Sequence, residues 1–216
     1  MTGVQTCALP ISSHFCSAER QYRFPLEYGG QRPPTAQWTA TAAGAAIVSA
    51  ERKPPFIQAV CFGRIQDLGI NDQNNMGAAM APAAASTIKT FFEDTGTGPE
   101  KYDLILTGDL GMVGSDLLDQ LLQKDGIDIA NRHQDCGLLL YDREKQQVEA
   151  GASGCGCAAS VASCHLLPHM QKNEGPRSAL LIATGALLSP TSIQQGETIP
   201  GIAHLVCFTA EERRLF

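Results

Sequence analysis

The sequence has no uninterrupted apolar run of the roughly 18 residues that a membrane-spanning helix requires. It also has little positive charge, because 16 lysines and arginines face 22 aspartates and glutamates, which gives a net charge of −6. A general nucleic-acid-binding protein needs a basic surface, so this balance argues against that class. No secretory signal is visible either. We therefore expect no spanning helix and no nucleic-acid partner, and any membrane association must be peripheral.

The chain also lacks the usual spacings of reactive or metal-binding cysteines, although it has eight cysteines in 216 residues. There is no C-x-x-C redox pair, and the cluster GASGCGCAASVASCH at 151–165 lacks the spacing and the second cysteine pair of a zinc site. With 44% hydrophobic residues the chain can build a core without disulfides, so we read the thiols as reduced. We predict that Cys155, Cys157 and Cys164 bind no metal and form no stable disulfide, and we expect no cofactor.

The glycines of this cluster leave two interpretations open. Gly154, Gly156 and the small thiols would let a helix begin close against the end of a strand, with the cysteines acting as small hydrophobic side chains. The same turn could instead bind an anion through free N–H groups at the helix start. A second turn between a strand and a helix, TGDLGMVG at 107–114, lacks the lysine of a phosphate-binding loop.

What the sequence does contain is an alternation of strand and helix patterns, which predicts an α/β layered sheet. Strands are expected at 39–50, 56–67, 102–109, 178–188 and 202–209, and helices at 75–94, 113–126 and 158–171. The first two strands are expected to pair through the turn ERKPP. We place Pro82 in the first turn of its helix, and in the next helix Ser115 as the N-cap and Gly126 as the C-terminal stop.

Two groups of side chains are candidates for binding a ligand. Asp109 follows an apolar strand, at the sheet edge where α/β proteins place their ligands, and capping the next turn is its alternative role. Upstream, guanidinium groups and tyrosine rings could form a pocket for a small aromatic or carboxylate ligand, with local ion pairs to Glu19 and Glu27 as the alternative. The members of this group are Arg20, Tyr22, Arg23, Tyr28 and Arg32. The isolated His14 and His204 are more typical of structural histidines.

Residues 1–11, MTGVQTCALPI, share none of the periodicity of the later chain and read like the translation of a sequencing-library adapter. We expect them to be an artefact. Cys7 would then have no role, and the biological sequence would begin near Ser12, within a domain.

Six segments together resemble the stage V sporulation protein AD family of spore-forming Firmicutes. They are SSHFCSAERQYRFPLEYGGQ, DLGINDQNNMGAAMAPAAASTI, YDLILTGDLGMVG, DCGLLLYD, GASGCGC and ATGALLSPTSIQQGETIPGIAH. The resemblance runs from about Ser12 to Phe208. It implies a thiolase-like fold of αβαβα layers built from two similar halves, of which residues 12–50 would be the end of the first and 51–216 the second.

The resemblance also implies a function. The family binds dipicolinic acid, pyridine-2,6-dicarboxylate, free or as its calcium chelate. It works with other stage V sporulation A proteins in transport at the inner membrane of the forespore and spore, with a link to germination. On this basis the ligand pocket would comprise His14, Arg20, Arg23, Tyr28, Arg32, Asp109, Ser153, Cys155 and His204. A homo-oligomer is compatible with this function.

The same resemblance argues against catalysis. Active ketoacyl synthases of this fold have a histidine after the strand that corresponds to YDLIL, where this chain has Thr107-Gly108-Asp109. They also have an asparagine at the turn that corresponds to GASGCGC, where this chain has none. We therefore expect a binding protein rather than an enzyme. Two alternatives stay open: an acyltransferase of the thiolase or ketoacyl synthase type, and a structural partner protein with a degenerate pocket.

Overall fold

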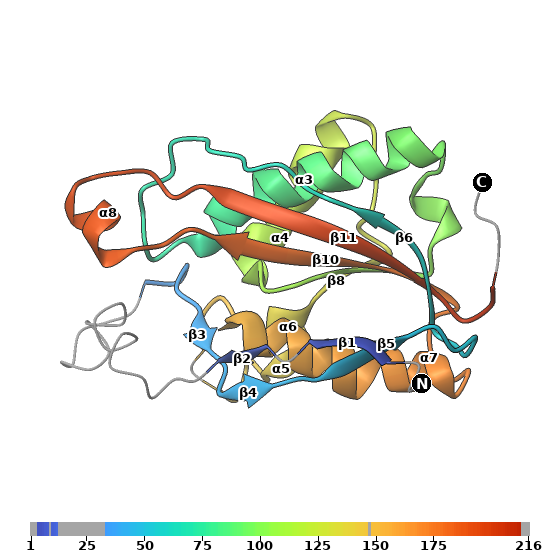
Figure 1. Cartoon of the computed structure of the whole chain (residues 1–216). Coiled ribbons are helices and arrows are strands. Elements are labelled where there is room, and N and C mark those ends of the chain that lie inside the picture. The colour runs from blue at the N-terminus through green and yellow to red at the C-terminus, as the bar shows by residue number, and fades with distance from the viewer. Residues whose placement is uncertain (1–3, 9, 13–32, 147, 213–216) are drawn as a thin grey trace.

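A computed structural model of the chain describes residues 4–8, 10–12, 33–146 and 148–212. Its centre is a five-stranded sheet in the order β6-β11-β10-β7-β8 (Figure 1). The strands are β6 (Phe56–Cys61), β7 (Leu104–Thr107), β8 (His133–Asp135), β10 (Ser178–Ala186) and β11 (Gly201–Thr209). Strand β7 runs parallel to β8 and β10, whereas β11 runs antiparallel to β10 and β6. The last strand of the chain therefore lies in the interior of the sheet.

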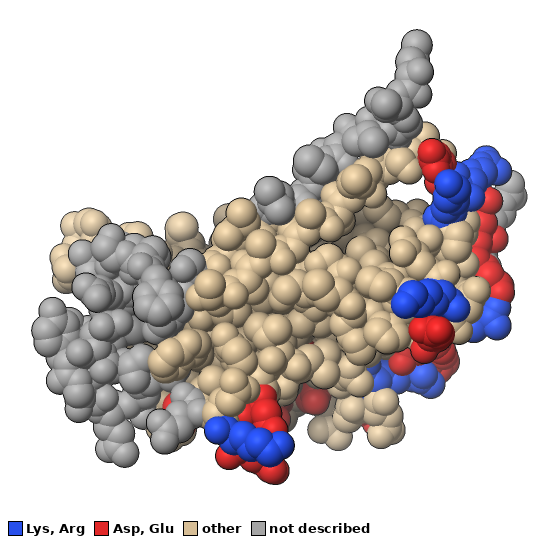
Figure 2. Space-filling model, turned by 90° about the horizontal axis from the view of Figure 1, so that it is seen from below, with Lys and Arg blue, Asp and Glu red and all other residues tan. Residues whose placement is uncertain are grey.

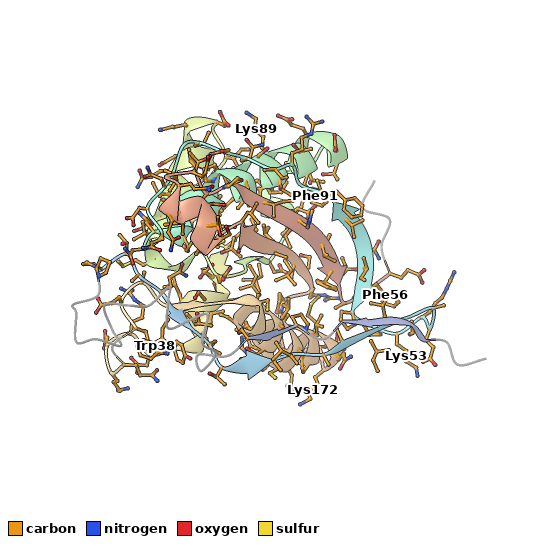
Figure 3. The ribbon with its side chains drawn as sticks, turned by 60° about the vertical axis from the view of Figure 1, so that its left-hand side comes forward. Trp38, Lys53, Phe56, Lys89, Phe91 and Lys172 are labelled. Carbon is orange, nitrogen blue, oxygen red and sulfur yellow. The ribbon has the colours of Figure 1, made fainter. Side chains whose placement is uncertain are left out.

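Two long helices cover one face of this sheet, α3 (Met76–Thr95) and α4 (Gly111–Lys124) (Figure 1). Alternate side chains of β10 and β11 point toward them, so that Leu180 and Leu205 join the apolar faces of both helices in one buried cluster. Phe91 of α3 belongs to this cluster and lies between the helix and the sheet (Figure 3). A short 3-10 helix, η1 (Pro99–Lys101), leads from α3 to β7.

Shorter helical segments cover the opposite face of the sheet. They are α5 (Cys136–Leu140), α6 (Cys155–Val161), the π-helical turn η2 (Ala162–Leu166) and α7 (Leu167–Gln171). Their buried side chains form a second cluster with the other face of β7 and β10. The connection between β10 and β11 carries one more helix, α8 (Pro190–Gln194).

Three pairs of short strands complete the described fold. The pairs are β1 (Val4–Ala8) with β5 (Ala46–Ser49), β2 (Ile11–Ser12) with β4 (Ala42–Ala43), and β3 (Trp38–Thr39) with β9 (Ala152–Ser153). Strands β2 and β4 lie against α6. Strand β9 leads directly into α6, so its pairing with β3 fixes where that helix begins.

The expected pairing of 39–50 with 56–67 is wrong. The first segment is divided among β3, β4 and β5, which belong to three different two-stranded sheets. The second forms β6, which pairs with β11 at the other end of the chain. Periodicity identifies residues that form strands, but it does not show which strands pair. Here β6 pairs with β11, which is far away in the sequence.

Two helix starts also differ from expectation. Pro82 lies inside α3, which begins six residues earlier at Met76, with Asn75 accepting the Ala78 N–H at 3.2 Å. Helix α4 begins at Gly111, so Ser115 lies inside the helix and is not its N-cap. The Ser115 side chain is buried. The predicted stop at Gly126 is confirmed, since this residue follows α4 with a φ of 76°.

The helical segment expected at 158–171 begins three residues earlier, at Cys155, and contains a π-helical turn. The other expected elements are present near their predicted positions. The strand expected at 102–109 is shorter than predicted, whereas β10 and β11 form an antiparallel pair.

Apolar side chains remain exposed along β6 and the segment that follows it. Ile57, Val60 and Phe62 have exposed fractions of 48%, 53% and 81%. Seen from below, charged side chains gather toward the edges of the molecule, and most of the face between them is uncharged (Figure 2). Strand β6 is at the edge of the sheet, and an edge strand with exposed apolar side chains is open to contact with another chain.

Helices α3 and α4 cross at two glycines, and a methyl group is expected to disturb this crossing. A Cβ atom on Gly114 would lie 2.7 Å from Gly77 Cα, which is backbone and cannot rotate away. We expect Gly114→Ala to lower the free energy of unfolding by about 2 kcal/mol, as measured by urea denaturation. Gly185→Ala is the control, because its Cβ would meet only Ile202 Cγ2 at 3.8 Å. Equal stability of the two variants would contradict this reading of the crossing.

Candidate functional site

Two glycine-containing turns meet at the end of β7. The turn at 108–111 leads into α4, and Gly154 precedes α6. Asp109 joins them: its Oδ2 accepts the Gly154 N–H at 2.8 Å, and its Oδ1 accepts the hydroxyl of Thr184 in β10 at 2.9 Å. We call Asp109, Thr184 and residues 153–155 the Asp109 corner. This carboxylate thus ties a turn, a strand and a helix start together.

Gln37 closes one side of the Asp109 corner. Its Nε2 donates to the carbonyl oxygens of Asp109 at 2.7 Å and Ala152 at 2.9 Å. Its Oε1 is buried and has no hydrogen-bond partner among the described residues. A buried amide oxygen of this kind is an acceptor site for a donor that the described protein atoms do not supply.

A second carboxylate, Asp135, lies behind the Asp109 corner and is only 1% exposed. Its Oδ1 accepts the N–H groups of Gly111 and Gly137, both at 2.9 Å. Its Oδ2 accepts the N–H of Leu110 at 2.9 Å and the hydroxyl of Thr107 at 2.7 Å. One side chain therefore caps the starts of both α4 and α5.

A chain of polar contacts runs from Asp135 to the surface. Thr107 Oγ1 lies 3.0 Å from His133 Nε2, and His133 Nδ1 lies 2.8 Å from Asp119 Oδ1. Thr107 is fully buried and the His133 side chain is 4% exposed, whereas the Asp119 side chain is 36% exposed. We call Asp119, His133, Thr107 and Asp135 the relay.

Burial dominates the electrostatics of this region. Removal from water raises the pKa of Asp109 from 3.8 to about 6, although the hydrogen bonds from Gly154 and Thr184 oppose the shift. Burial also raises the pKa of Asp135, against its hydrogen bonds from Thr107, Gly111 and Leu110. The pKa values of the Cys136 and Cys157 thiols are raised strongly, first by burial and then by nearby carboxylates. These thiols are therefore poor sources of nucleophilic thiolate.

The structure brings three of the predicted site residues together, namely Asp109, Ser153 and Cys155. Ser153 Oγ lies 3.4 Å from Thr39 Oγ1, and the exposed Cys155 thiol donates to the Ile11 carbonyl at 3.1 Å. His204 lies two strands from β7, opposite Ala183 in the β10–β11 ladder, and its Nδ1 accepts the Gly63 N–H at 3.1 Å. Five predicted residues lie outside the described part of the chain: His14, Arg20, Arg23, Tyr28 and Arg32.

Most N–H groups of the two turns already have acceptors within the protein, contrary to the idea that they are free for an anion. Those of Leu110 and Gly111 donate to Asp135, and the Asp109 N–H donates to Thr184 Oγ1 at 3.1 Å. The N–H groups of Gly154 and Gly156 donate to Asp109 and to Ser12 Oγ. The close-packing interpretation of the glycine cluster therefore describes these turns better than the anion-binding one.

Sequence reasoning missed Gln37, His133 and Asp135. An aspartate directly before Cys-Gly, at the end of a short polar segment, was the available signal for Asp135 as a helix cap. No local pattern marks His133 or Gln37, because their partners come from distant segments.

The described residues include no group of three or more histidine, cysteine, aspartate or glutamate side chains placed to hold a metal ion. Six cysteines are free thiols, namely Cys61, Cys136, Cys155, Cys157, Cys164 and Cys207. None of the described helices has the length and apolar character needed to cross a membrane.

The model of one protein family, stage V sporulation protein AD (SpoVAD), matches residues 3–209. The chain belongs to this family. It is 50% identical over 197 residues to stage V sporulation protein AD of Bacillus subtilis strain 168, covering 91% of this chain and 58% of that protein. This chain therefore spans less than two thirds of the relative's length. The matched range includes residues 3–11, and the adapter origin of residues 1–11 stays a prediction.

One solved structure shares the fold at low sequence identity. The tetronic acid condensing enzyme AbyA1 superposes with a TM-score of 0.51 at 13% identity, covering 96% of this chain and 60% of that one. 3-Oxoacyl-[acyl-carrier-protein] synthase III from Aquifex aeolicus VF5 gives a TM-score of 0.43 at 14% identity, over 77% and 48% of the two chains. The predicted thiolase-like α/β fold is confirmed, while the division into halves at residue 50 stays a prediction.

Proposed function

We propose that this family member is a non-catalytic ligand-binding protein that binds dipicolinate during its transport into the forespore. The proposal includes a peripheral position at the inner membrane and other stage V sporulation A proteins as partners. The observation that carries it is the family match across residues 3–209. The proposal is compatible with a homo-oligomer in which a second copy of the chain completes the ligand pocket.

The chemistry of the described residues supports binding over catalysis. The buried thiols of Cys136 and Cys157 are held away from the thiolate form. Asp119, His133 and Thr107 lie in the order of an acid–base–nucleophile triad, but Thr107 is 0% exposed and its hydroxyl donates to Asp135. A nucleophile must reach its substrate, so this arrangement supports a structural role.

A flat dianion at the Asp109 corner requires cationic partners. Asp109 and Asp135 form no ion pair with a lysine or arginine in the described ranges, and their own negative charge would oppose a bound carboxylate. We assign the positive charge to Arg20, Arg23 and Arg32, which can pair with carboxylates bidentately. His14, Tyr28 and His204 are the further pocket residues in this proposal, alongside Ser153 and Cys155.

We expect Arg32→Ala to weaken dipicolinate binding about tenfold to a hundredfold, because one charge-assisted hydrogen bond contributes about 1.5–3 kcal/mol. Calorimetric titration of the folded protein measures the effect, and a thermal melt of each variant monitors folding. Arg52→Ala is the matched control, since the Arg52 side chain is 82% exposed and pairs only loosely with Glu212 at 3.7 Å.

The outcomes of this titration separate the candidate functions. Unchanged affinity in a folded Arg32→Ala variant would remove Arg32 from the site. A wild-type protein that binds no dipicolinate would refute the proposed function and favour the structural partner protein. Turnover of an acyl thioester by the wild-type protein would instead favour the acyltransferase alternative.

The proposed position at the membrane has its own test. A peripheral protein should leave the membrane fraction in alkaline carbonate, whereas an integral protein stays. The exposed apolar side chains of Ile57, Val60 and Phe62, together with the absence of a spanning helix among the described residues, support a docked, peripheral protein.

A further inference from the structure

We propose that His133 is a positioning residue of the Asp109 corner, which shares one proton with Asp135 through the hydroxyl of Thr107. This proton would control how firmly Asp135 holds the turn that carries Asp109. The effect on binding rests on the proposed function, whereas the shared proton is a property of the relay alone.

The relay needs one proton more than its neutral imidazole and hydroxyl carry. The relay has three contacts in series: Asp119 to His133, His133 to Thr107, and Thr107 to Asp135, at 2.8, 3.0 and 2.7 Å. Each contact at such a distance needs one hydrogen between its two heavy atoms. A neutral imidazole and a hydroxyl supply only two, because each carries one polar hydrogen. The Gln134 carbonyl oxygen, 3.3 Å from Thr107 Oγ1, is a further acceptor for the same hydroxyl and supplies no hydrogen. The observed geometry therefore requires one additional proton.

That proton has two places that satisfy all three contacts. In the first, His133 is an imidazolium that donates to both Asp119 and Thr107, and Thr107 donates to an ionised Asp135. In the second, a protonated Asp135 donates to Thr107, Thr107 donates to His133 Nε2, and His133 Nδ1–H donates to Asp119. Moving one proton from His133 to Thr107 while Thr107 passes its own to Asp135 converts the first into the second. No proton is gained or lost in this step.

The groups around the relay favour retention of the extra proton. Asp119 faces His133 from α4, and Asp109 lies in the turn that follows β7 and couples to Asp135. Cys136 of α5 also neighbours Asp135. All of these groups are neutral or negative, and the described residues include no lysine or arginine paired with the relay. Negative neighbours stabilise a nearby proton.

The relay can act on the Asp109 corner because Asp135 holds the residues next to Asp109. The N–H groups of Leu110 and Gly111, which follow Asp109 in the chain, both donate to the Asp135 carboxylate. Hydrogen bonds to an ionised carboxylate are roughly twice as strong as those to a neutral one. Loss of the extra proton at high pH leaves Asp135 permanently ionised, so it then holds the Leu110 and Gly111 N–H groups most firmly. The contact left without a hydrogen is one of the two that His133 makes, and that contact lengthens.

Three variants test the relay. Thr107→Val keeps the shape of the side chain but removes the hydroxyl, Thr107→Ser keeps the hydroxyl, and Asp119→Asn removes the charge at the exposed end. NMR titration of the His133 ring and the Asp135 carboxyl is the readout. In the wild type and Thr107→Ser we expect both signals to change at one common pH, and in Thr107→Val at two separate ones. In Asp119→Asn the common change should move to lower pH, whereas the control His165→Ala, at an exposed position on η2, should leave it unmoved.

Independent titration of His133 and Asp135 in the wild type would overturn the shared proton. Dipicolinate titration then tests the positioning role, with an expected loss of affinity of about tenfold in Thr107→Val, the size of one hydrogen bond to a charged group. A common NMR titration with unchanged affinity in that variant would overturn the positioning role. A common NMR titration in a protein that binds no dipicolinate would refute the proposed function and leave the shared proton standing. If Thr107→Val does not fold, the shift of the common NMR titration in Asp119→Asn tests the shared proton instead.

Discussion

Replacement of Asp135 by alanine is expected to lower the free energy of unfolding by about 4 kcal/mol. The carboxylate accepts three backbone N–H groups and one hydroxyl, and it is 1% exposed. Alanine would leave these donors buried with no acceptor, and each such donor costs about 1–3 kcal/mol when water cannot reach it. Because water can enter the space that the carboxyl leaves, the total should fall below the sum of the single contributions. Urea denaturation followed by circular dichroism measures the loss.

Two further variants show whether the acceptor itself is responsible. Asp135→Asn keeps one oxygen and replaces the other by a donor, so its stability should lie between wild type and Asp135→Ala. Asp128→Ala is the control, because Asp128 is exposed and accepts only the Ala130 N–H at 3.1 Å. A loss below about 1 kcal/mol in Asp135→Ala, similar to that of an exposed site, would show that the capping contacts contribute little.

The second large effect is a dependence of stability on pH that Asp109→Asn should remove. The pKa of Asp109 is raised from 3.8 to about 6 by burial, so the folded state binds its proton more tightly than the unfolded state does. The stabilisation from this proton is fully present below pH 3.8 and is lost as pH rises through about 6. The pKa difference corresponds to about 3 kcal/mol, at 1.36 kcal/mol per pKa unit.

Asparagine does not titrate, so the variant lacks this loss. Between about pH 3 and about pH 7.5 the stability of Asp109→Asn relative to wild type should therefore rise by about 3 kcal/mol. Comparison of the two proteins at each pH cancels the contribution of other titrating groups. Asp116→Asn, at an exposed position on α4, should show no such change. A constant difference between Asp109→Asn and wild type would mean that the Asp109 carboxyl is not desolvated.

The elements themselves were largely predictable, because their signals are local. Unbroken apolar runs marked β7, β10 and β11, and helical spacing of apolar residues marked α3 and α4. The pairing of β6 was not predictable, since its partner lies at the far end of the chain. The start of α4 was missed for a related reason: its cap is a carboxylate from β8 rather than a nearby serine.

The candidate site was also predictable only in part. The position of Asp109 at the end of a strand followed from the sequence, whereas its partners Thr184 and Gly154 are brought to it only by the sheet and the start of α6. The role of Asp135 depends on the pairing of β7 with β8, which places Thr107 directly opposite it. No local sequence pattern predicts the register of β7 against β8. Strand β8 is also too short for its periodicity to be recognised.

The interior position of β11 affects the order of events during synthesis. Strand β6 has β11 as its neighbour in the sheet, and β10 has β11 on one side, yet β11 ends only at Thr209. At elongation rates of about 5–20 residues per second, a nascent chain spends on the order of ten seconds with β6 made and its partner absent. Unpaired strand edges with exposed apolar side chains are where chains associate. A ribosome-bound chain that stops before Gly201 should therefore be held by chaperones, and release should follow once β11 enters between β6 and β10.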